Sequence, residues 1–424
     1  MGSGGLNALD ELLSEFRTTP LSGCPAPFQG GAAGFLAYDL GAEIEALPSP
    51  RCRDLDIPDL ELGFYDGVIA WNHRTRRCFV VSTGLPLRGE QRAERSEKRA
   101  AELVAWIRGE SAPPEPRGGL AKLAASGADR RDPGSDASAR SLEYRFDGQG
   151  GLTSGFTRPG YEQAVRAAID KIRAGDIFQV NLSQRFSAPA PPDAISYYLE
   201  LRHRAPAPFG AWFGGSRCSI ASASPERFVR RSAGGRLEAR PIKGTRPRGA
   251  DPESDRRLAA ELVTSDKDRA ENLMIADLIR NDLSRVSGAG TVRAASLFGL
   301  ESYATVHHLV SVIQGETRPR LGPVDVVRAM FPCGSVTGAP KIRAMELITE
   351  FEPVARGPSY GSLGWLGFDG RLDLNVAIRT VVLVGDRAVF HVGGAVVADS
   401  EPSDEYRETL DKARALAGSL SFEV

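Results

Sequence analysis

The stretch YEQAVRAAIDKIRAGDIFQVNLSQRF (161–186) contains one predicted helix, followed at once by one predicted strand. From Tyr161 to Ala174, apolar residues recur at helical spacing, and Gly175 marks the expected end of the helix. In FQVNLSQRF, apolar and polar residues alternate, which is typical of a strand with two different faces. The helix stripe holds Val165, Ile169 and Ile172, the apolar strand face Phe178, Val180 and Leu182, and the polar strand face Gln179, Asn181 and Ser183.

Outside this stretch, the predicted strands and helices come in clusters and do not alternate strictly. Strict alternation would favour a parallel sheet, as in a Rossmann fold or an α/β barrel. Clustering favours an α+β fold, with large, mostly antiparallel sheets in a sandwich-like core flanked by helices. Further strands are expected at 218–222, 227–231, 237–242, 361–368, 374–383 and 388–392, and further helices at 253–263, 266–283, 324–330, 340–351 and from 404 onward.

Residues 111–158 differ from the rest of the chain in composition. They are rich in Pro, Gly, Ser and charge and poor in large apolar residues, so we expect a mobile linker or surface excursion. This linker separates an N-terminal segment, 1–110, from a longer C-terminal segment, 159–424. In the N-terminal segment we expect a helix at 9–16, a Gly-rich turn entering a strand at 30–41, and two strands in GFYDGVIAWNH and RCFVVSTG.

The overall composition excludes several classes of protein. Apolar residues make up 42% and charged residues 25% of the chain, which is ordinary for a globular protein and excludes disorder throughout. The net charge of −1 gives no basic footprint for nucleic acid or for an anionic membrane. Five scattered cysteines without CxxC spacing, no signal-peptide core and no long apolar run predict a cytosolic protein with reduced thiols.

Two predicted helices place acidic residues where a metal ion could bind. In DKDRAENLMIADLIRNDL, Glu271 lies on the apolar stripe, with Asp268 one turn earlier. In the last helix, Glu405, Glu408 and Lys412 share one face. Mg²⁺ typically takes one or two carboxylates together with waters and a substrate oxygen. The alternative is that Glu405 and Glu408 are first-turn carboxylates favoured by the helix dipole, and that Glu271 pairs with an arginine.

A lysine and a helix start are further candidates. Lys243, in RPIKGTRPRG, is predicted to end a strand just before Gly244, from where its amine could reach into a cleft. Desolvation would make that amine a better nucleophile, whereas the alternative is a surface lysine in a basic loop. In GSVTGAPK, Thr337 and Gly338 precede a helix with Pro340 at its first position, which predicts an exposed helix N-terminus that can receive an anion.

Two shorter patterns give weaker indications. Gly393 and Gly394 could offer a second backbone anion site, although isolated glycine pairs are usually turns. His307 and His308 have no metal-ligand spacing to another histidine, which favours a structural role when they are considered alone.

Taken together, these stretches resemble the chorismate-utilising enzymes, a family that includes anthranilate, aminodeoxychorismate, isochorismate and salicylate synthases. The resemblance covers residues from about 160 to 424 and extends to PFQGGAAGFLAYDLG (27–41). The matching segments are SPERF (224–228), PIKGT (241–245), DRAENLMIADLIRNDLSRV (268–286), HHLVS (307–311), FPCGSVTGAPKIRAMELI (331–348), RGPSYGSLGWLGF (356–368), AIRT (377–380) and GGAVVADSEPSDEYRETLDKA (393–413).

Two positions separate the branches of this family. Its water-using members carry a lysine base on the strand that reads FQVNLSQ here, and this chain has Gln179 there, as the ammonia-using members do. Anthranilate synthases read PIAGT where this chain reads PIKGT. The resemblance therefore implies the aminodeoxychorismate branch, with Lys243 as its mark.

The resemblance also assigns roles to individual residues. Glu271 and Glu408 would bind Mg²⁺ directly, with Asp268 and Glu405 supporting through waters. Glu226, in SPERF, would act as general acid on the departing C4 hydroxyl of chorismate. Lys243 would attack the ring at C2, and ammonia would then add at C4 and expel the lysine. The positions that match substrate contacts are Gln179, His308, Thr337, Tyr360, Arg379, Gly393, Gly394 and Lys412.

The source of ammonia and the start of the chain lead to two further expectations. We find no glutaminase signature, and the resemblance implies a separate glutamine amidotransferase subunit that supplies ammonia. Relatives usually carry several dozen more residues before PFQGG, so we expect a shortened edge of one sheet and doubt that tryptophan binds.

Overall fold

The computed structural model describes residues 4–113, 122–125, 143–146 and 151–422. Its larger sheet contains β1 (Gly31–Leu36), β2 (Leu60–Tyr65), β5 (Lys122–Ala125), β11 (Arg227–Arg231), β12 (Arg236–Ala239), β13 (Ile242–Pro247), β14 (Arg293–Ser302), β15 (Val306–Glu316), β17 (Ser362–Gly367) and β18 (Leu372–Asn375). The strand order is β13-β15-β12-β11-β18-β17-β1-β2-β5, and β14 also pairs with β15.

The second sheet contains β6 (Tyr144–Arg145), β7 (Thr153–Ser154), β8 (Gln179–Pro189), β9 (Ala211–Gly214), β10 (Ser219–Ser222), β16 (Gly338–Ala339), β19 (Thr380–Val384) and β20 (Arg387–Val396). Its order is β6-β7-β8-β20-β19-β10-β9, and β16 also pairs with β8. A separate hairpin joins β3 (Gly67–Asn72) to β4 (Arg77–Ser82). Each strand pair in the described part of the chain is antiparallel, which confirms the α+β fold expected from the clustering of elements.

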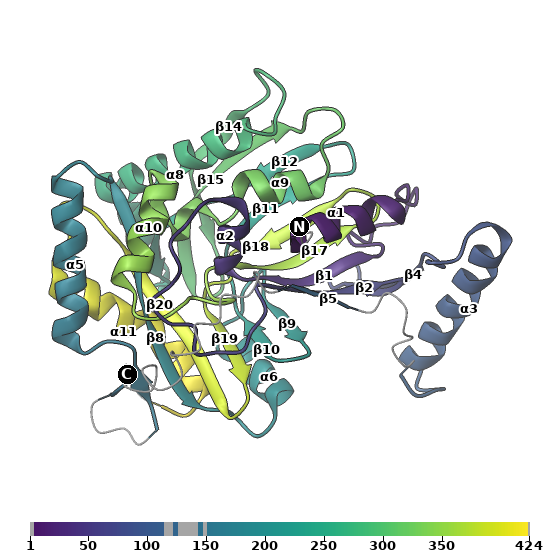
Figure 1. Cartoon of the computed structure of the whole chain (residues 1–424), viewed down its shortest axis with the longest axis horizontal. Coiled ribbons are helices and arrows are strands. Elements are labelled where there is room, and N and C mark those ends of the chain that lie inside the picture. Colours follow the sequence, from purple (N-terminus) through teal and green to yellow (C-terminus); the bar gives the residue numbers. More distant parts are fainter. Residues whose placement is uncertain (1–3, 114–121, 126–142, 147–150, 423–424) are drawn as a thin grey trace.

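Helices flank both sheets (Figure 1). They are α1 (Gly5–Glu15), α2 (Gly41–Ile44), α3 (Gly89–Ile107), α5 (Arg158–Arg173), α6 (Ala194–Arg204), α7 (Pro252–Thr264), α8 (Asp266–Ser284), α9 (Pro323–Met330), α10 (Lys341–Phe351) and α11 (Pro402–Ser419). Helices α5 and α11 contact each other and cover β8 and β20, whereas α8 packs on β15. Helix α3 lies apart with the β3–β4 hairpin, at the right of Figure 1.

Buried apolar side chains pack between the two sheets. Side chains from β1, β10, β17, β19 and β20 pack there in a single apolar cluster, which includes Phe35, Ile220, Leu363, Val382 and Val389. The cluster fixes one sheet against the other, because buried apolar side chains interdigitate at close to crystalline density. Segments that connect a strand of one sheet to a strand of the other are therefore fixed by both sheets.

The helix and strand predicted within 161–186 are present as α5 and β8, with three differences. Helix α5 begins at Arg158, because the Thr157 hydroxyl accepts the Gly160 N–H (3.2 Å) and a proline lies in the first turn. On β8 the predicted polar face is as buried as the apolar face, since neighbouring strands and α10 cover it. Phe178 was assigned wrongly: it precedes β8 and is 69% exposed.

Two strands predicted as continuous are each divided. The strand expected at 374–383 is β18 followed by β19, which belong to different sheets, and that expected at 237–242 is β12 followed by β13. The chain thus crosses between the sheets after β18, and again between β10 and β11. The division at 1–110, 111–158 and 159–424 stays a prediction: β1 and β2 pair within the larger sheet, and most of 111–158 lies outside the described residues.

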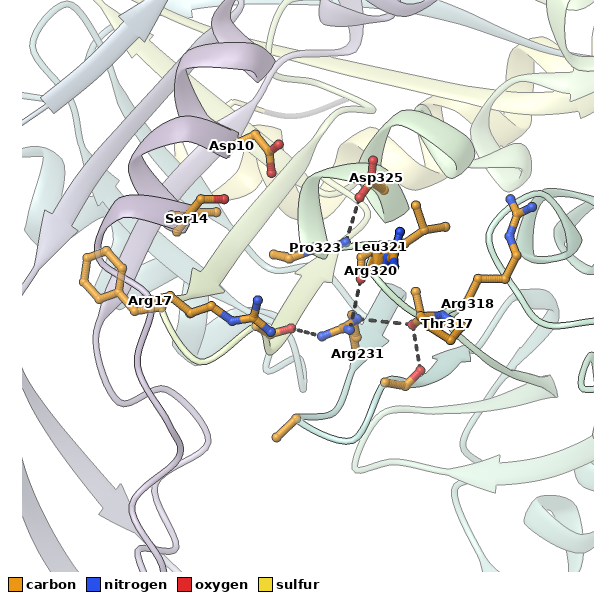
Figure 2. Close-up of a pocket in the computed structure, with 18 of the residues that line it drawn as sticks. Asp10, Ser14, Arg17, Arg231, Thr317, Arg318, Arg320, Leu321, Pro323 and Asp325 are labelled. Atoms are coloured by element: carbon orange, nitrogen blue, oxygen red, sulfur yellow. Dashed lines mark hydrogen bonds between the residues drawn. The ribbon is translucent and has the colours of Figure 1, made fainter.

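A cavity of about 380 Å³ lies between α1, the β11–β12 turn, the loop before α9 and the β17–β18 turn (Figure 2). Arg231, at the end of β11, donates to the Thr317 hydroxyl (3.2 Å) and to the Leu321 carbonyl (3.3 Å), so it joins β11 to the loop before α9. None of the residues predicted to act on chorismate lines this cavity.

All five cysteines are free thiols, and no helix in the described ranges has both the length and the apolarity required to cross a membrane.

Candidate active site

Helices α8 and α11 bring acidic side chains toward one another. Ser265 caps α8 by accepting the Asp268 N–H (3.2 Å), which starts the helix one turn before Glu271. Burial raises the pKa of Glu271, and the negative charge of Glu408 raises it further, against the lowering effect of Lys243. The charge of one carboxylate acts on the other only where the two are within electrostatic reach. Glu271 of α8 and Glu408 of α11 are thus within electrostatic reach of each other in the folded chain.

Gly394 makes room for the carboxylates of α11. A methyl group on its α-carbon would lie 2.7 Å from Glu405 Oε2 and 3.4 Å from Glu408 Oε1. Lys412 Nζ pairs with Glu408 Oε1 (2.6 Å) and donates to the Gly393 carbonyl (2.8 Å), so it links the helix to β20. Gly393 and Gly394 lie inside β20, paired with β8, and do not form the turn that is usual for such a pair.

The donor set is compatible with a hard cation held by few protein ligands. Glu271 forms no ion pair with an arginine among the described residues, so the simpler explanation for this carboxylate fails. Glu405 does lie in the first turn of α11, where it accepts from Ser400 (2.6 Å), but its Oε2 is buried with no partner in the described chain. No group of three or more His, Cys, Asp or Glu side chains in the described ranges is arranged to hold a metal, and Asp268 pairs with Arg246 (3.1 Å). Mg²⁺ fits such a site through two carboxylates, waters and a substrate oxygen.

Lys243 lies in a β-bulge. The sequence predicted that it ends a strand, but it is the second residue of β13. Ile242 pairs with Val310 and Thr245 with His308, so two residues, Lys243 and Gly244, oppose a single residue of β15. Gly244 has a φ of +87°, which glycine adopts without strain. A bulge leaves its extra residue out of the regular ladder and redirects its side chain.

The amine of Lys243 lies among the acidic groups of the site. Burial lowers its pKa, and the positive charge of Lys412 adds to this, while Glu271, Glu226 and Glu408 act in the opposite direction. Lys243 is half-buried and its pKa is lowered, which favours a desolvated lysine over a surface lysine in a basic loop. A lysine with a lowered pKa has a larger fraction of its amine neutral and able to attack carbon.

Glu226 lies where the chain crosses from β10 to β11, and it is 4% exposed. Burial raises its pKa to about 7, although the Ser335 hydroxyl, Lys243 and the Ile242 N–H lower it. Its Oε1 has no hydrogen-bond partner among the described residues. A carboxyl group that stays partly protonated near neutral pH can donate a proton to a leaving group.

The second crossing, from β18 to β19, carries Arg379. The Ala223 N–H donates to the Arg379 carbonyl (2.9 Å), and the Val376 N–H to the Glu226 carbonyl (3.0 Å), so the two crossings are bonded to each other. Arg379 forms no ion pair in the described part of the chain. A half-buried guanidinium without a carboxylate partner is suited to an anionic ligand.

Backbone strain marks two of the predicted substrate contacts. Tyr360 has a φ of +63° and Arg379 a φ of +49°, in the left-handed region that side chains other than glycine rarely occupy. Such conformations persist only where the surroundings impose them, and they gather at functional sites.

His308 is a neutral member of the site. Burial and the charge of Arg379 lower the pKa of its imidazole to about 4, so the ring is neutral at pH 7. Its Nδ1 contacts the Thr245 hydroxyl (2.9 Å).

The loop before α10 closes the deepest part of the site. Thr337 is completely buried, and its hydroxyl donates to the carbonyls of Cys333 and Gly334 (both 3.2 Å). The prediction of an exposed helix N-terminus was wrong at these residues, because Gly338 pairs with β8 and brings the loop under cover. Gln179, opposite Ala339, is completely buried, and neither end of its amide has a partner among the described residues.

Three further residues take part that the sequence did not single out for a role. Ser335 bonds to Glu226, and Asn181 has a buried Oδ1 without a partner in the described chain. Lys267 lowers the pKa of both Glu271 and Glu408. Asn181 was predictable in part, since it follows Gln179 on the polar face of β8. Unpartnered polar atoms on Gln179, Asn181, Glu226 and Glu405 indicate a polar ligand, because buried polar groups are otherwise nearly always bonded.

Comparison with known proteins agrees with this geometry. The family model of chorismate binding enzymes matches residues 6–418. Aminodeoxychorismate synthase component 1 of Escherichia coli (strain K12) is 37% identical over 415 residues, which is 98% of this chain and 82% of that protein. Anthranilate synthase component 1 of Thermus thermophilus is 40% identical over 397 residues, 93% of this chain and 78% of that protein.

Solved structures give the same result. The crystal structure of anthranilate synthase component I from Streptococcus pneumoniae TIGR4 matches with a TM-score of 0.78 and 31% identity, over 96% of this chain and 84% of that one. The family match spans nearly the whole chain and includes every residue of the candidate site. With its two antiparallel sheets and its acidic, lysine-bearing site, this chain belongs to the chorismate binding enzyme family.

Proposed function

We propose that this chain is the large subunit of an aminodeoxychorismate synthase, which converts chorismate and ammonia to 4-amino-4-deoxychorismate for 4-aminobenzoate and folate synthesis. The observation that carries the proposal is Lys243: its amine lies in a bulge, has a lowered pKa, and is within electrostatic reach of Glu226 and Glu271. Similarity alone does not choose the reaction, since relatives of both the aminodeoxychorismate and the anthranilate type match at 37% to 40% identity.

In the proposed reaction, Lys243 and Glu226 share the first step. The neutral amine of Lys243 forms a bond to C2 of chorismate and loses a proton, while the ring double bonds shift and the C4–O bond breaks. Glu226 gives its proton to the departing oxygen, which leaves as water because hydroxide is a poor leaving group. The carboxylate formed in this way takes the proton that Lys243 loses. Ammonia then forms a bond at C4, the double bonds shift back, and the C2–N bond to Lys243 breaks with return of a proton to the amine.

Substrate binding follows from the charges of the site. Chorismate is a dianion, and Arg379 offers a guanidinium without a carboxylate partner in the described chain, while Lys412 supplies a second cation. Neutral His308, the carbonyl-bonded Thr337 and the ring of Tyr360 provide polar and apolar contacts around them. Gln179, whose amide has no partner among the described residues, takes the place where water-using relatives carry a base.

Mg²⁺ is part of the proposal. Glu271 and Glu408 would hold it directly, with Asp268 and Glu405 acting through waters, and Glu405 Oε2 has no other partner in the described chain. The ion would neutralise and fix the ring carboxylate of chorismate.

Substitution of Gly394 by alanine tests the placement of the cation. The added methyl group would lie 2.7 Å from Glu405 Oε2, so at least one carboxylate must move. We expect the Mg²⁺ concentration for half-maximal activity, and the Kd for Mg²⁺ in calorimetry, to rise by about tenfold or more. Gly418→Ala, on the helix α11 that carries Glu405 and Glu408, meets nothing within 4 Å and serves as the control. An unchanged Mg²⁺ requirement in Gly394→Ala would place the cation elsewhere.

The ammonia donor would be a glutamine amidotransferase subunit. The relatives are named as component 1 of their synthases, which supports a two-subunit enzyme. Five free thiols support a location in the cytosol. We expect ammonium salts to replace the partner in vitro, since the candidate site lies within this chain.

Product identification tests the proposal against its alternatives. Purified protein is incubated with chorismate, Mg²⁺ and ammonium, and products are separated and weighed by mass spectrometry with and without a lyase that releases 4-aminobenzoate. We expect a product that gives 4-aminobenzoate only with the lyase. Direct formation of fluorescent anthranilate would show an anthranilate synthase. No consumption of chorismate, together with binding of an amidotransferase, would show a non-catalytic paralogue.

A further inference from the structure

A completely buried ion pair lies next to the candidate site, outside the residues assigned to the reaction. Arg356 and Glu352 are each 3% exposed. Arg356 Nε donates to Glu352 Oε2 (2.9 Å) and Nη2 donates to Oε1 (2.6 Å), which makes the pair bidentate. Burial of two charges carries a large desolvation cost, so a pair in this position is weak evidence for stability alone.

The remaining contacts of Arg356 are with other segments. Its Nη1 donates to the Val336 carbonyl (2.8 Å) and its Nη2 to the Asn181 carbonyl (2.7 Å). Its guanidinium carbon also lies 4.5 Å from the centroid of the Tyr38 ring and 4.6 Å from that of the Tyr360 ring. One side chain thus makes polar contacts at its edges and cation–π contacts with two aromatic rings.

The residues that Arg356 contacts belong to the candidate site or lie beside residues that do. Val336 lies between Ser335, which bonds to Glu226, and the buried Thr337. Asn181 lies on β8 two residues after Gln179. Tyr360 is itself a predicted substrate contact, and its strained backbone must be held by its surroundings. Glu352 adds to this, since its Oε1 also accepts from the N–H and the hydroxyl of Ser183 (2.8 and 2.9 Å) on β8.

We propose that Arg356 is a positioning residue that holds the ring of Tyr360, the loop of Thr337 and strand β8 in the geometry that binds the substrate. It acts through these groups and does not touch the substrate. Lysine cannot replace it, because an ammonium has neither the planar fork that reaches a carboxylate and two carbonyls together nor the flat surface that stacks on aromatic rings. The inference rests on the proposed function only in taking chorismate as the substrate.

Arg356→Lys tests the inference against a matched control. Arg185, which lies on β8, also forms a buried bidentate pair, with Asp54 (2.7 and 2.6 Å), but its side chain bonds to no residue of the candidate site. We expect both lysine variants to lower the thermal unfolding midpoint. Only Arg356→Lys should raise the KM for chorismate, by about tenfold or more, with a smaller change in kcat, because displacement of positioning groups by about 1 Å can cost up to a hundredfold.

Two further variants keep the test decisive if Arg356→Lys folds poorly. Tyr38→Leu removes one of the two rings, and the Tyr38 hydroxyl has no hydrogen-bond partner in the described chain, so no polar contact is lost. We expect a smaller rise in KM than for Arg356→Lys. The second variant is Tyr360→Leu, which is combined with Tyr38→Leu in a double-mutant cycle. The rise in KM of the double variant should be smaller than the product of the two single rises, since both rings act on the substrate site through Arg356.

The measurements separate this inference from the proposed function. Disappearance of chorismate is followed, which does not depend on the product that forms. If the wild-type protein consumes no chorismate, the proposed function fails. If it does, but Arg356→Lys has the KM of the wild type, or Tyr38→Leu leaves KM unchanged and the cycle is strictly multiplicative, Arg356 is a structural residue only and the inference is wrong.

Discussion

Lys243→Ala is expected to reduce formation of the aminated product by about a thousandfold or more, because it removes the nucleophile of the first step. Burial lowers the pKa of Lys243 in its bulge, and among the described residues Lys243 is the lysine that lowers the pKa of both Glu226 and Glu271. The measurement is the initial rate of product formation from chorismate and ammonium at saturating Mg²⁺.

A second readout follows the covalent step itself. Wild-type protein quenched in acid during turnover should contain a fraction with the added mass of chorismate minus water, located by peptide mapping on Lys243. The control is Lys171→Ala. In the wild-type protein the Lys171 ammonium lies on the surface, 3.5 Å from Asp176, so this variant should keep full activity and should still form the adduct on Lys243. Amination that survives in Lys243→Ala would overturn the covalent route and indicate direct attack by ammonia.

Glu226→Gln is expected to lower kcat by roughly a hundredfold to ten-thousandfold, the range usual for the loss of a general acid. Glutamine has nearly the same shape and can still bond to Ser335, so folding and substrate binding should change little. The rate of chorismate consumption and the KM for chorismate distinguish loss of the proton donor from loss of the site. A KM that rises as strongly as kcat falls would contradict a role in proton transfer.

The pH dependence of the wild-type enzyme provides an independent check on Glu226. Its pKa is raised to about 7 by burial, and a general acid acts only while protonated. The rate should therefore be independent of this group well below pH 7 and fall about tenfold per pH unit well above it. Lys243 gives the opposite slope, because its attack requires the neutral amine and its lowered pKa brings that form to lower pH. The remaining activity of Glu226→Gln should lack the fall above pH 7.

The parts of the fold predictable from sequence were those fixed by local pattern. The helix after Thr157 and strand β8 follow from spacing within a few residues. What the pattern did not show is that both faces of β8 are buried, since that depends on α10 and on neighbouring strands far along the chain. The strand expected at 374–383 failed for a similar reason: its apolar residues continue through a passage between two sheets, and residue type alone does not reveal the change of sheet.

The site was predictable where the family resemblance supplied long-range order. Spacing placed Glu271 on the apolar stripe of its helix, and in the folded chain the charge of Glu408, on another helix, raises its pKa. Lys243 was identified, but its bulge was not, because a bulge is a relation between two strands. Arg356 gave only a local sign, its separation of four residues from Glu352, and such pairs are common on exposed helices. Its contacts with Val336 and Asn181 exist only in the folded chain.

The bulge at Lys243 also bears on how such a site can change over time. Because the extra residue is held by the backbone, with Gly244 supplying the left-handed turn, the lysine side chain itself is not needed to keep β13 and β15 in register. Replacement of the Lys243 side chain should leave the architecture intact. It should change only whether ammonia attacks chorismate that is covalently bound to the enzyme or chorismate that is not. Chemical route and structural integrity are thus set by different atoms of the same residue, which allows one to diverge while the other is conserved.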